Sequence, residues 1–392
     1  MNRLNISVPM RLVFITALQN ALFVVPVVIT YYGEKGVNLG AFLLMQALFK
    51  VSVLVLEVPT GYLADRWDRH TQLKVSAVLA LVAHTMLIFA QGFGGVFLVE
   101  LTLALACAFA SGTREAYLYE ALRQRGNMKR MVEWQSALML ASMLAEMVCG
   151  LVAGWLFVQW LHWPAVAESV AALLALTLAW SLPNVPRTKR DAVHANPWID
   201  LWNVLHMNLR KHPKVPWLVL GPFTLFGQTL VLFWVFLSKM NDLLDPVWIS
   251  WAVASMFAVK ALLVWKSGWL VRTLGERNMV RLLPVLLLVG TVAMVFSQQV
   301  WLVWLGAVVG GSSVHALGKP MVISLISHNV VDGERATILS TGSMVNACYS
   351  AVLLFAAPVL MAAGLSLNIV TFWFTVFTLV LAAYPLWRLQ RQ

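Results

Sequence analysis

Hydrophobic positions in this chain form long runs that are separated by short polar and charged segments. An α-helix needs about 20 mostly apolar residues to cross a bilayer. Runs near this length occur twelve times, at 10–31, 38–60, 73–92, 95–118, 134–159, 164–182, 215–238, 247–266, 280–298, 300–325, 337–362 and 366–387. The pattern therefore predicts an all-α membrane protein with twelve transmembrane helices.

The first run follows Arg3 and Arg11, so a cleaved signal peptide is the alternative interpretation. Residues 12–31 are too long for the apolar core of a signal peptide, and no small-x-small cleavage site follows them. We expect this run to be a retained helix.

Composition supports lipid as the main solvent of the chain. Hydrophobic residues make up 60% of the sequence, charged residues 11%, and the mean hydropathy is +0.78, whereas soluble domains are about 25% charged. The net charge of +11 raises the alternative of a nucleic-acid partner. The basic residues lie in short loops between apolar runs, where they set membrane topology, so we expect no nucleic acid to bind. The three cysteines, Cys107, Cys149 and Cys348, lie inside apolar runs at spacings that imply neither a disulfide framework nor a metal site.

Lysine and arginine predict the orientation of the chain. If both termini are cytoplasmic, 22 of the 28 basic residues fall in cytoplasmic segments, and the outer loops hold only Lys35 and Lys239. The remaining four lie within helices: Lys50, Arg114, Lys260 and Lys319. The positive-inside rule therefore favours a multi-pass protein with both termini in the cytoplasm.

A long basic loop divides the chain into two halves. We expect an N-terminal six-helix half at 1–186, a cytoplasmic loop at 187–214 and a C-terminal six-helix half at 215–392. Within the loop, Asn196-Pro197 resembles a helix start, and apolar residues then recur at helical spacing. This predicts an amphipathic helix on the membrane surface, although a simple linker remains the plainer alternative.

The two halves repeat at a constant offset. Gly61-Tyr62-Leu63 recurs as Gly268-Trp269-Leu270 after 207 residues, and Ser111-Gly112 matches Leu317-Gly318 after 206 residues. Internal repeats of this kind are common in transporters. The sequence thus predicts two pseudo-symmetric halves.

The most specific motif begins at Gly61 and reads GYLADRWDRH. Gly61 would let two helices approach closely, and Asp65 at a helix end needs a helix N-terminus or an arginine as partner. Arg66 and Arg69 would bind lipid phosphates or acidic side chains. The motif resembles the loop signature between helices 2 and 3 of the major facilitator superfamily, which implies the major facilitator fold for the whole chain.

Two details qualify and extend the resemblance. Asp68 stands where the family usually has glycine, and Arg272 stands in the second half where the first has Asp65. The stretches from Glu57 (EVPTG) and from Ser111 (SGTREAYLYEAL) resemble a bacterial subgroup that includes presumed exporters of drugs and siderophores. The resemblance implies a bacterial inner-membrane location, and it makes Glu120 the partner of Arg69 or Arg66 in an inner gate. A static structural ion pair is the alternative role.

Ionisable residues deeper in the apolar runs are candidates for substrate or proton binding, because each is costly in lipid unless it is paired or hydrated. They are Lys50, Glu100, Arg114, Glu115, Glu146, Lys260, His315 and Lys319. The family arrangement implies that Glu146 and Lys260 can meet between the halves. Snorkelling to the interface or bonding to backbone carbonyls is the alternative for each, and we expect a structural role for His84.

The deep cations outnumber the deep carboxylates, which favours an anionic or zwitterionic substrate. Polar and aromatic residues suited to a cavity lining are Gln19, Asn20, Gln228, Trp234, Asn346 and Tyr349.

Three classes of function follow from these features. The first is proton-coupled export of a drug-like or siderophore-like compound, and the second is uptake of an organic anion or metal chelate by the same fold. The third, a membrane enzyme, is disfavoured because the sequence contains no H-E-x-x-H, G-x-S-x-G or phosphate-binding glycine motif. We expect no cofactor, a proton gradient as driving force, lipid and a small solute as partners, and a monomer.

Overall fold

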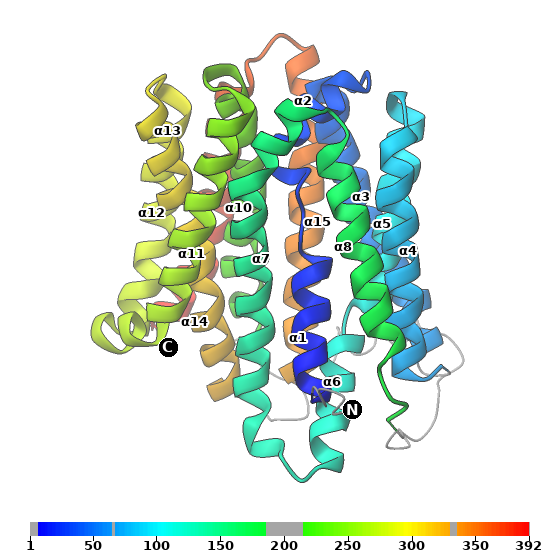
Figure 1. The fold of residues 1–392 in the computed structure, drawn as a ribbon. Helices are drawn as coiled ribbons and strands as arrows, with labels where there is room; N and C mark the ends of the chain where they lie inside the picture. The colour runs from blue at the N-terminus through cyan, green and yellow to red at the C-terminus, as the bar shows by residue number, and fades with distance from the viewer. Residues whose placement is uncertain (1–6, 65–66, 186–214, 330–334, 392) are drawn as a thin grey trace. The chain divides into compact units, whose positions relative to one another are not determined.

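The computed structural model describes residues 7–64, 67–185, 215–329 and 335–391, and every element within these ranges is helical (Figure 1). The elements in chain order are α1 (Val8–Gln19), η1 (Val25–Val27), α2 (Val28–Glu34), α3 (Leu39–Ala64), α4 (Arg69–Phe89), α5 (Gly92–Ala110), α6 (Thr113–Gln124), η2 (Met128–Arg130), α7 (Met131–Gln159), α8 (Trp163–Trp180), α10 (Val215–Leu243), α11 (Pro246–Leu274), α12 (Glu276–Phe296), α13 (Val300–Gly306), η3 (Ala307–Ser313), α14 (Val314–Asn329), α15 (Arg335–Ala362) and α16 (Leu367–Arg391).

Eleven stretches in the described part of the chain are long and apolar enough to cross a membrane, judged by length and composition alone. They correspond to the second through twelfth runs of the sequence. The first run contains α1, a shorter apolar helix, followed by η1 and α2. The all-α membrane fold predicted from the sequence is thereby confirmed.

The first run is not the single continuous helix that its apolar length predicts. α1 ends at Gln19, and helical structure resumes only at Val25. The Asn20 side chain donates back to the Thr16 carbonyl at 2.8 Å, and Pro26 lies in the first turn of η1. Proline has no N–H to donate and fits a helix start better than a helix interior. The break therefore leaves nearby backbone N–H groups that need other partners.

The fourth run, predicted over 95–118, is also interrupted. α5 ends at Ala110, and α6 begins at Thr113. Gly112 between them has a φ of 68°, a left-handed conformation that glycine adopts without the steric cost of a Cβ atom. Because of this turn, Arg114 and Glu120 lie on a separate short helix and not on an extension of α5.

The described residues group into two compact units, each held together by its own contacts. Unit 1 takes its residues from Met1–Val37, Ser52–Pro197 and Pro246–Ala254, and unit 2 from Asn38–Val51, Trp198–Asp245 and Ser255–Gln392. α3 and α11 are each divided between the units. The domain boundaries drawn from the sequence stay a prediction, and the expected amphipathic helix within 187–214 lies outside the described residues.

Each unit has its own packing centre. In unit 1, α1, α4, α6 and α8 meet around buried residues that include Leu12, Leu73, Tyr117 and Ala179. In unit 2, α10 is central: 83% of its most apolar stretch is buried, and it packs against α12, α14, α15 and α16. Most other spans present large apolar side chains on their surfaces, as expected of helices that face lipid.

A pair of lysines shows the repeat in atomic detail. Lys35 Nζ donates to the carbonyls of Ile88 and Ala90, at 3.2 and 2.9 Å, where α4 ends. Lys239 Nζ donates to the carbonyls of Met294 and Val295, at 2.8 and 2.7 Å, where α12 ends. Both lysines are buried. Lys35 lies between α2 and α3 as the sequence predicts, whereas the placement of Lys239 in a loop is corrected, because it lies within α10. Each lysine caps the carbonyl end of a helix in its own unit.

Three glycines let α12 approach the helix formed by α13 and η3. A Cβ atom on Gly290 would collide with the Gly310 backbone nitrogen and would lie 2.6 Å from the Gly306 carbonyl oxygen. A Cβ on Gly306 would in turn lie 2.6 Å from the Gly290 oxygen. Gly306 and Gly310 are four residues apart, the spacing at which small residues allow close packing of membrane helices.

Candidate functional site

An ion pair joins α4 to α6 at the end of unit 1 where α4 begins. Arg69 Nε lies 3.8 Å from Glu120 Oε1, and the two side chains are 17% and 10% exposed. Beside them, the Thr113 hydroxyl donates to Gln72 Oε1 at 2.7 Å, which again links α6 to α4. The arrangement matches the partner that the motifs imply for Glu120. Its proposed role as a gate stays a prediction.

Other parts of the signature motif are only partly described. Asp65 and Arg66 lie outside the described residues. A Cβ atom on Gly61 would meet no atom of the described residues within 4 Å, so the close helix approach inferred from this glycine is not seen there. Glu57 is half-buried on α3, and the neighbouring Thr60 hydroxyl donates to the Ala108 carbonyl of α5 at 3.2 Å.

A guanidinium lies next to the break in the first run. Arg114 in the first turn of α6 donates through Nη2 to Gln19 Oε1, the last residue of α1, at 2.8 Å. Its buried Nε has no hydrogen-bond partner among the described residues. Guanidinium groups have five N–H donors in a planar fork. Arg114 therefore keeps donor capacity that a carboxylate or phosphate oxygen can fill.

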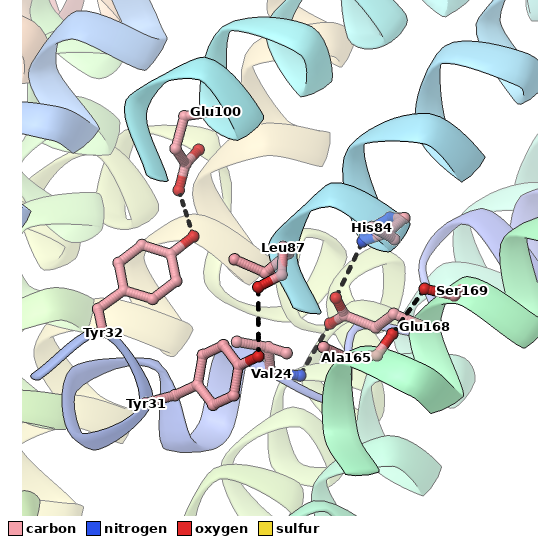
Figure 2. A network of polar contacts seen from close by, with 9 residues as sticks. All are labelled: Val24, Tyr31, Tyr32, His84, Leu87, Glu100, Ala165, Glu168 and Ser169. Carbon is pink, nitrogen blue, oxygen red and sulfur yellow. Dashed lines mark hydrogen bonds and ion pairs between the residues drawn. The ribbon is translucent and has the colours of Figure 1, made fainter. Parts of the chain in front are cut away.

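A second polar network of unit 1 crosses the break itself (Figure 2). Glu168 on α8 accepts the Val24 backbone N–H through Oε1 at 2.8 Å, and its Oε2 lies 2.9 Å from His84 Nδ1 on α4. The Glu168 and His84 side chains are 3% and 8% exposed. The carboxylate thus satisfies one of the backbone donors that the break leaves open.

Glu100 lies in the same part of unit 1 and bonds to α2. The Tyr32 hydroxyl donates to Glu100 Oε1 at 2.8 Å (Figure 2), and both residues are buried. The adjacent Tyr31 hydroxyl lies 3.5 Å from the Leu87 carbonyl oxygen and 3.3 Å from His162 Nδ1. α2 is therefore held to α4 and α5 by its two tyrosines.

Unit 2 contains a buried polar cluster around α10. Gln228 Nε2 donates to the Thr375 hydroxyl at 2.8 Å, and Thr375 lies 3.2 Å from the Thr291 hydroxyl. Gln228 Oε1 has no hydrogen-bond partner within the described ranges. The Tyr349 hydroxyl lies 2.6 Å from the Thr378 hydroxyl, so the predicted lining residues Gln228 and Tyr349 both contact α16.

The predicted cations of unit 2 gather near one histidine. His315 packs edge-on against Phe226, with ring centroids 5.7 Å apart, and Lys260 and Lys319 both act electrostatically on it. The structure thus places two of the predicted cations, Lys260 and Lys319, near enough to His315 to act on it electrostatically. Elsewhere in unit 2, the predicted lining residue Trp234 packs edge-on against Phe42, with ring centroids 5.2 Å apart.

The remaining candidates are more dispersed. Lys50 Nζ lies 5.8 Å from the Phe49 ring centroid, and Glu146 acts electrostatically on Cys149. Glu115 is exposed in the first turn of α6, so it is less shielded than a residue deep in an apolar run. Asn346 on α15 is half-buried.

Sequence reasoning missed Glu168. It is an acidic residue in the apolar run 164–182, the same signal by which the other deep carboxylates were found. His84 was assigned a structural role because the third helix of this fold is usually peripheral and a lone histidine there is more often structural, and in the structure it contacts Glu168.

Residues 11–346 match the model of the Major Facilitator Superfamily, and no curated protein matches the sequence. Among solved structures, the nucleoside transporter NupG aligns with a TM-score of 0.76 at 14% identity, covering 96% of this chain and 98% of NupG. A D-xylose-proton symporter aligns at 0.75 and 14% identity, covering 96% of each chain.

A bacterial homologue of the iron transporter ferroportin aligns with a TM-score of 0.72 at 16% identity, covering 98% of this chain and all of that one. At these identities the structures show a shared fold, whereas the family match spans most of the sequence. This chain belongs to the Major Facilitator Superfamily and is a multi-pass membrane transporter, not an enzyme.

Proposed function

We propose that the chain is a secondary active transporter that moves a small organic anion by proton-coupled alternating access. The observation that carries the proposal is Arg114, a mostly buried guanidinium bonded to Gln19 with its Nε unpaired among the described residues. The two lysines that act electrostatically on His315 in unit 2, Lys260 and Lys319, support the same substrate charge.

Similar structures do not select the solute, because their names refer to nucleosides, D-xylose with protons, peptides and iron. Proton coupling is supported by buried carboxylates, of which Glu100 and Glu168 are the best defined in the described part of the chain. Export of a drug-like or siderophore-like compound is supported by the resemblance of the EVPTG and SGTREAYLYEAL stretches to presumed exporters, and uptake by the same fold is the alternative. Solute accumulation in cells with and without the protein decides between export and uptake.

Arg114→Gln should lower the affinity of the protein for an anionic substrate by about ten- to a hundredfold. A charge-assisted hydrogen bond in a shielded site contributes about 1.5–3 kcal/mol, and each 1.4 kcal/mol corresponds to about tenfold in affinity. The measurement is inhibition of transport in proteoliposomes by matched anionic, neutral and cationic analogues. Lys319→Gln is tested in the same way, because it is the corresponding cation of the second half.

Arg130→Gln is the matched control, because Arg130 is exposed and bonded to Glu133. It should leave the preference among analogues unchanged. A wild-type preference for cationic analogues would contradict the proposal. So would an anion preference that survives both Arg114→Gln and Lys319→Gln.

Arg69→Ala should slow transport while the protein still inserts into the membrane. The Arg69–Glu120 pair is partly shielded, so its loss should shift the balance of conformations by on the order of tenfold, the effect of about 1.4 kcal/mol. Glu120→Gln should have the same effect, and Asp65→Asn is expected to act similarly. Turnover is measured in proteoliposomes after the amounts of folded protein are matched.

The double variant Arg69→Ala, Glu120→Gln separates a pair interaction from two independent effects. If the pair sets the rate, the double variant should be no slower than either single one. Arg130→Ala provides the exposed control for the loss of an arginine. Normal turnover in both single variants would exclude the gating role.

A further inference from the structure

Glu168 joins three segments of unit 1 at one buried carboxylate. Its side chain extends from α8, accepts a hydrogen bond from the Val24 N–H in the break of the first run, and contacts His84 on α4 (Figure 2). Its side chain is only 3% exposed. A buried charge with no partner costs several kcal/mol, so the protonation state of this group and the packing around it must depend on each other.

The two side chains have few ways to share protons without leaving a net charge. With one proton held on either Glu168 Oε2 or His84 Nδ1, which lie 2.9 Å apart, in addition to the His84 Nε2 proton, the pair is neutral overall. This holds whether the carboxylate faces an imidazolium or a carboxylic acid faces a neutral imidazole. Loss of that proton leaves one negative charge in a buried position. The packed arrangement around Val24 therefore favours the proton-loaded pair.

We propose that Glu168 and His84 form a proton-binding site whose loaded state holds the break of the first helical run, through Val24, against α4 and α8. Uptake or release of one proton at this pair then favours or disfavours the packed break. The role of this proton in driving transport rests on the proposed function. Proton binding itself does not.

Within the described ranges, the other ionisable groups near the pair supply no second cation that replaces His84. Cys149 on α7 and Tyr31 and Tyr32 on α2 act electrostatically with Glu168, and all three are neutral when protonated. Two further groups are acidic and therefore supply no cation. Glu100 on α5 accepts a hydrogen bond from Tyr32, and Glu146 on α7 acts electrostatically on Cys149.

Four basic groups lie in the surroundings of the pair. His162 contacts Tyr31, and burial together with Lys35 lowers the pKa of His162, which favours its neutral form. Lys35 itself donates to the carbonyls at the end of α4. Lys74 lies 5.6 Å from the Trp180 ring, and Arg11 bonds to Ser181. Trp180 is twelve residues beyond Glu168, or about 18 Å along a helix, so these two cations do not replace His84 either.

The test compares melting of the purified full-length protein across pH. Over the pH range in which the purified protein stays folded, the wild type should lose melting temperature as pH rises, because loss of the proton leaves an uncompensated buried charge. The variant His84→Gln, Glu168→Gln keeps polar groups at both positions and an oxygen that can accept the Val24 N–H, but it binds no proton there. Its melting temperature should fall by several degrees less over the same range.

Glu34→Gln is the matched control, because it removes an exposed carboxylate at the end of α2 and should retain the wild-type pH dependence. If the double variant does not fold, Glu168→Gln alone is measured, since it also keeps an acceptor for Val24. Equal pH dependence in the wild type and in the Glu168 variant would overturn the site.

Transport separates this inference from the proposed function. Glu168→Gln should abolish accumulation driven by a pH gradient and spare counterflow, which needs only the solute site. If the wild type shows no proton-driven transport, the coupling in the proposed function fails, while the melting comparison still decides whether the pair binds a proton.

Discussion

Gly290→Ala should destabilise the protein more than the addition of a single methyl group suggests. The added Cβ would collide with the Gly310 backbone nitrogen and lie 2.6 Å from the Gly306 carbonyl oxygen. Backbone atoms cannot rotate away as the end of a flexible side chain can, so α12 and the α13–η3 helix must separate. Overpacking of this kind costs about 1–3 kcal/mol. We expect a lower melting temperature in detergent and a lower yield of monodisperse protein on size-exclusion chromatography.

Gly268→Ala provides the matched control with the opposite expected sign. Gly268 is exposed in α11, and a Cβ there would meet no atom of the described residues within 4 Å. Alanine favours a helix over glycine by about 1 kcal/mol, so this variant should melt at the same temperature or slightly higher. Equal melting temperatures for Gly290→Ala and the wild type would show that the two helices can separate at no cost.

Length and hydropathy predicted the fold because lipid leaves a spanning chain few alternatives to the helix. The same signal gave no information on breaks inside a run. Gly112 was recognised as part of the repeat, but its left-handed φ was not. Its match at the 206 offset, Gly318, lies within α14 with Phe226 packed against it. One residue type thus serves a turn in one half and close packing in the other.

The candidate site was predictable as a set of residues but not as a set of contacts. Arg69 and Glu120 were paired because two motifs placed them at helix ends that a known family brings together. Arg114 was found as a charge in an apolar run, whereas its bond to Gln19 depends on a helix break that hydropathy does not show. Glu168 bonds to a backbone N–H, and no side-chain pattern indicates which backbone groups a break leaves open.

The two lysines at helix ends illustrate the same limit. Counting charges placed Lys35 and Lys239 in loops, because a short polar segment between apolar runs is normally solvated. In the structure both ammonium groups fold back onto helix carbonyls. Lys239 follows Lys35 by 204 residues, close to the offset of the glycine repeats. The duplicated half thus kept a helix cap whose residues show little other sequence similarity.

Lys239→Met should lower the melting temperature substantially. The substitution keeps most of the apolar length of the side chain but removes the donor to the Met294 and Val295 carbonyls. These carbonyls belong to the last turn of α12, which has no intrahelical donors for them and forms the negative end of the helix dipole. Each buried acceptor left unpaired costs about 1–3 kcal/mol.

Lys35→Met should have a smaller effect in the same direction, because its hydrogen bonds at 3.2 and 2.9 Å are longer than those of Lys239. The two lysines belong to different compact units and cap different helices, so the decreases should add in the double variant. Lys266→Met is the control: Lys266 is exposed and lies 4.3 Å from the Trp265 ring centroid. If Lys239→Met melted like Lys266→Met, the ammonium of Lys239 would contribute nothing to holding α12, and the capping role would have to be abandoned in both halves.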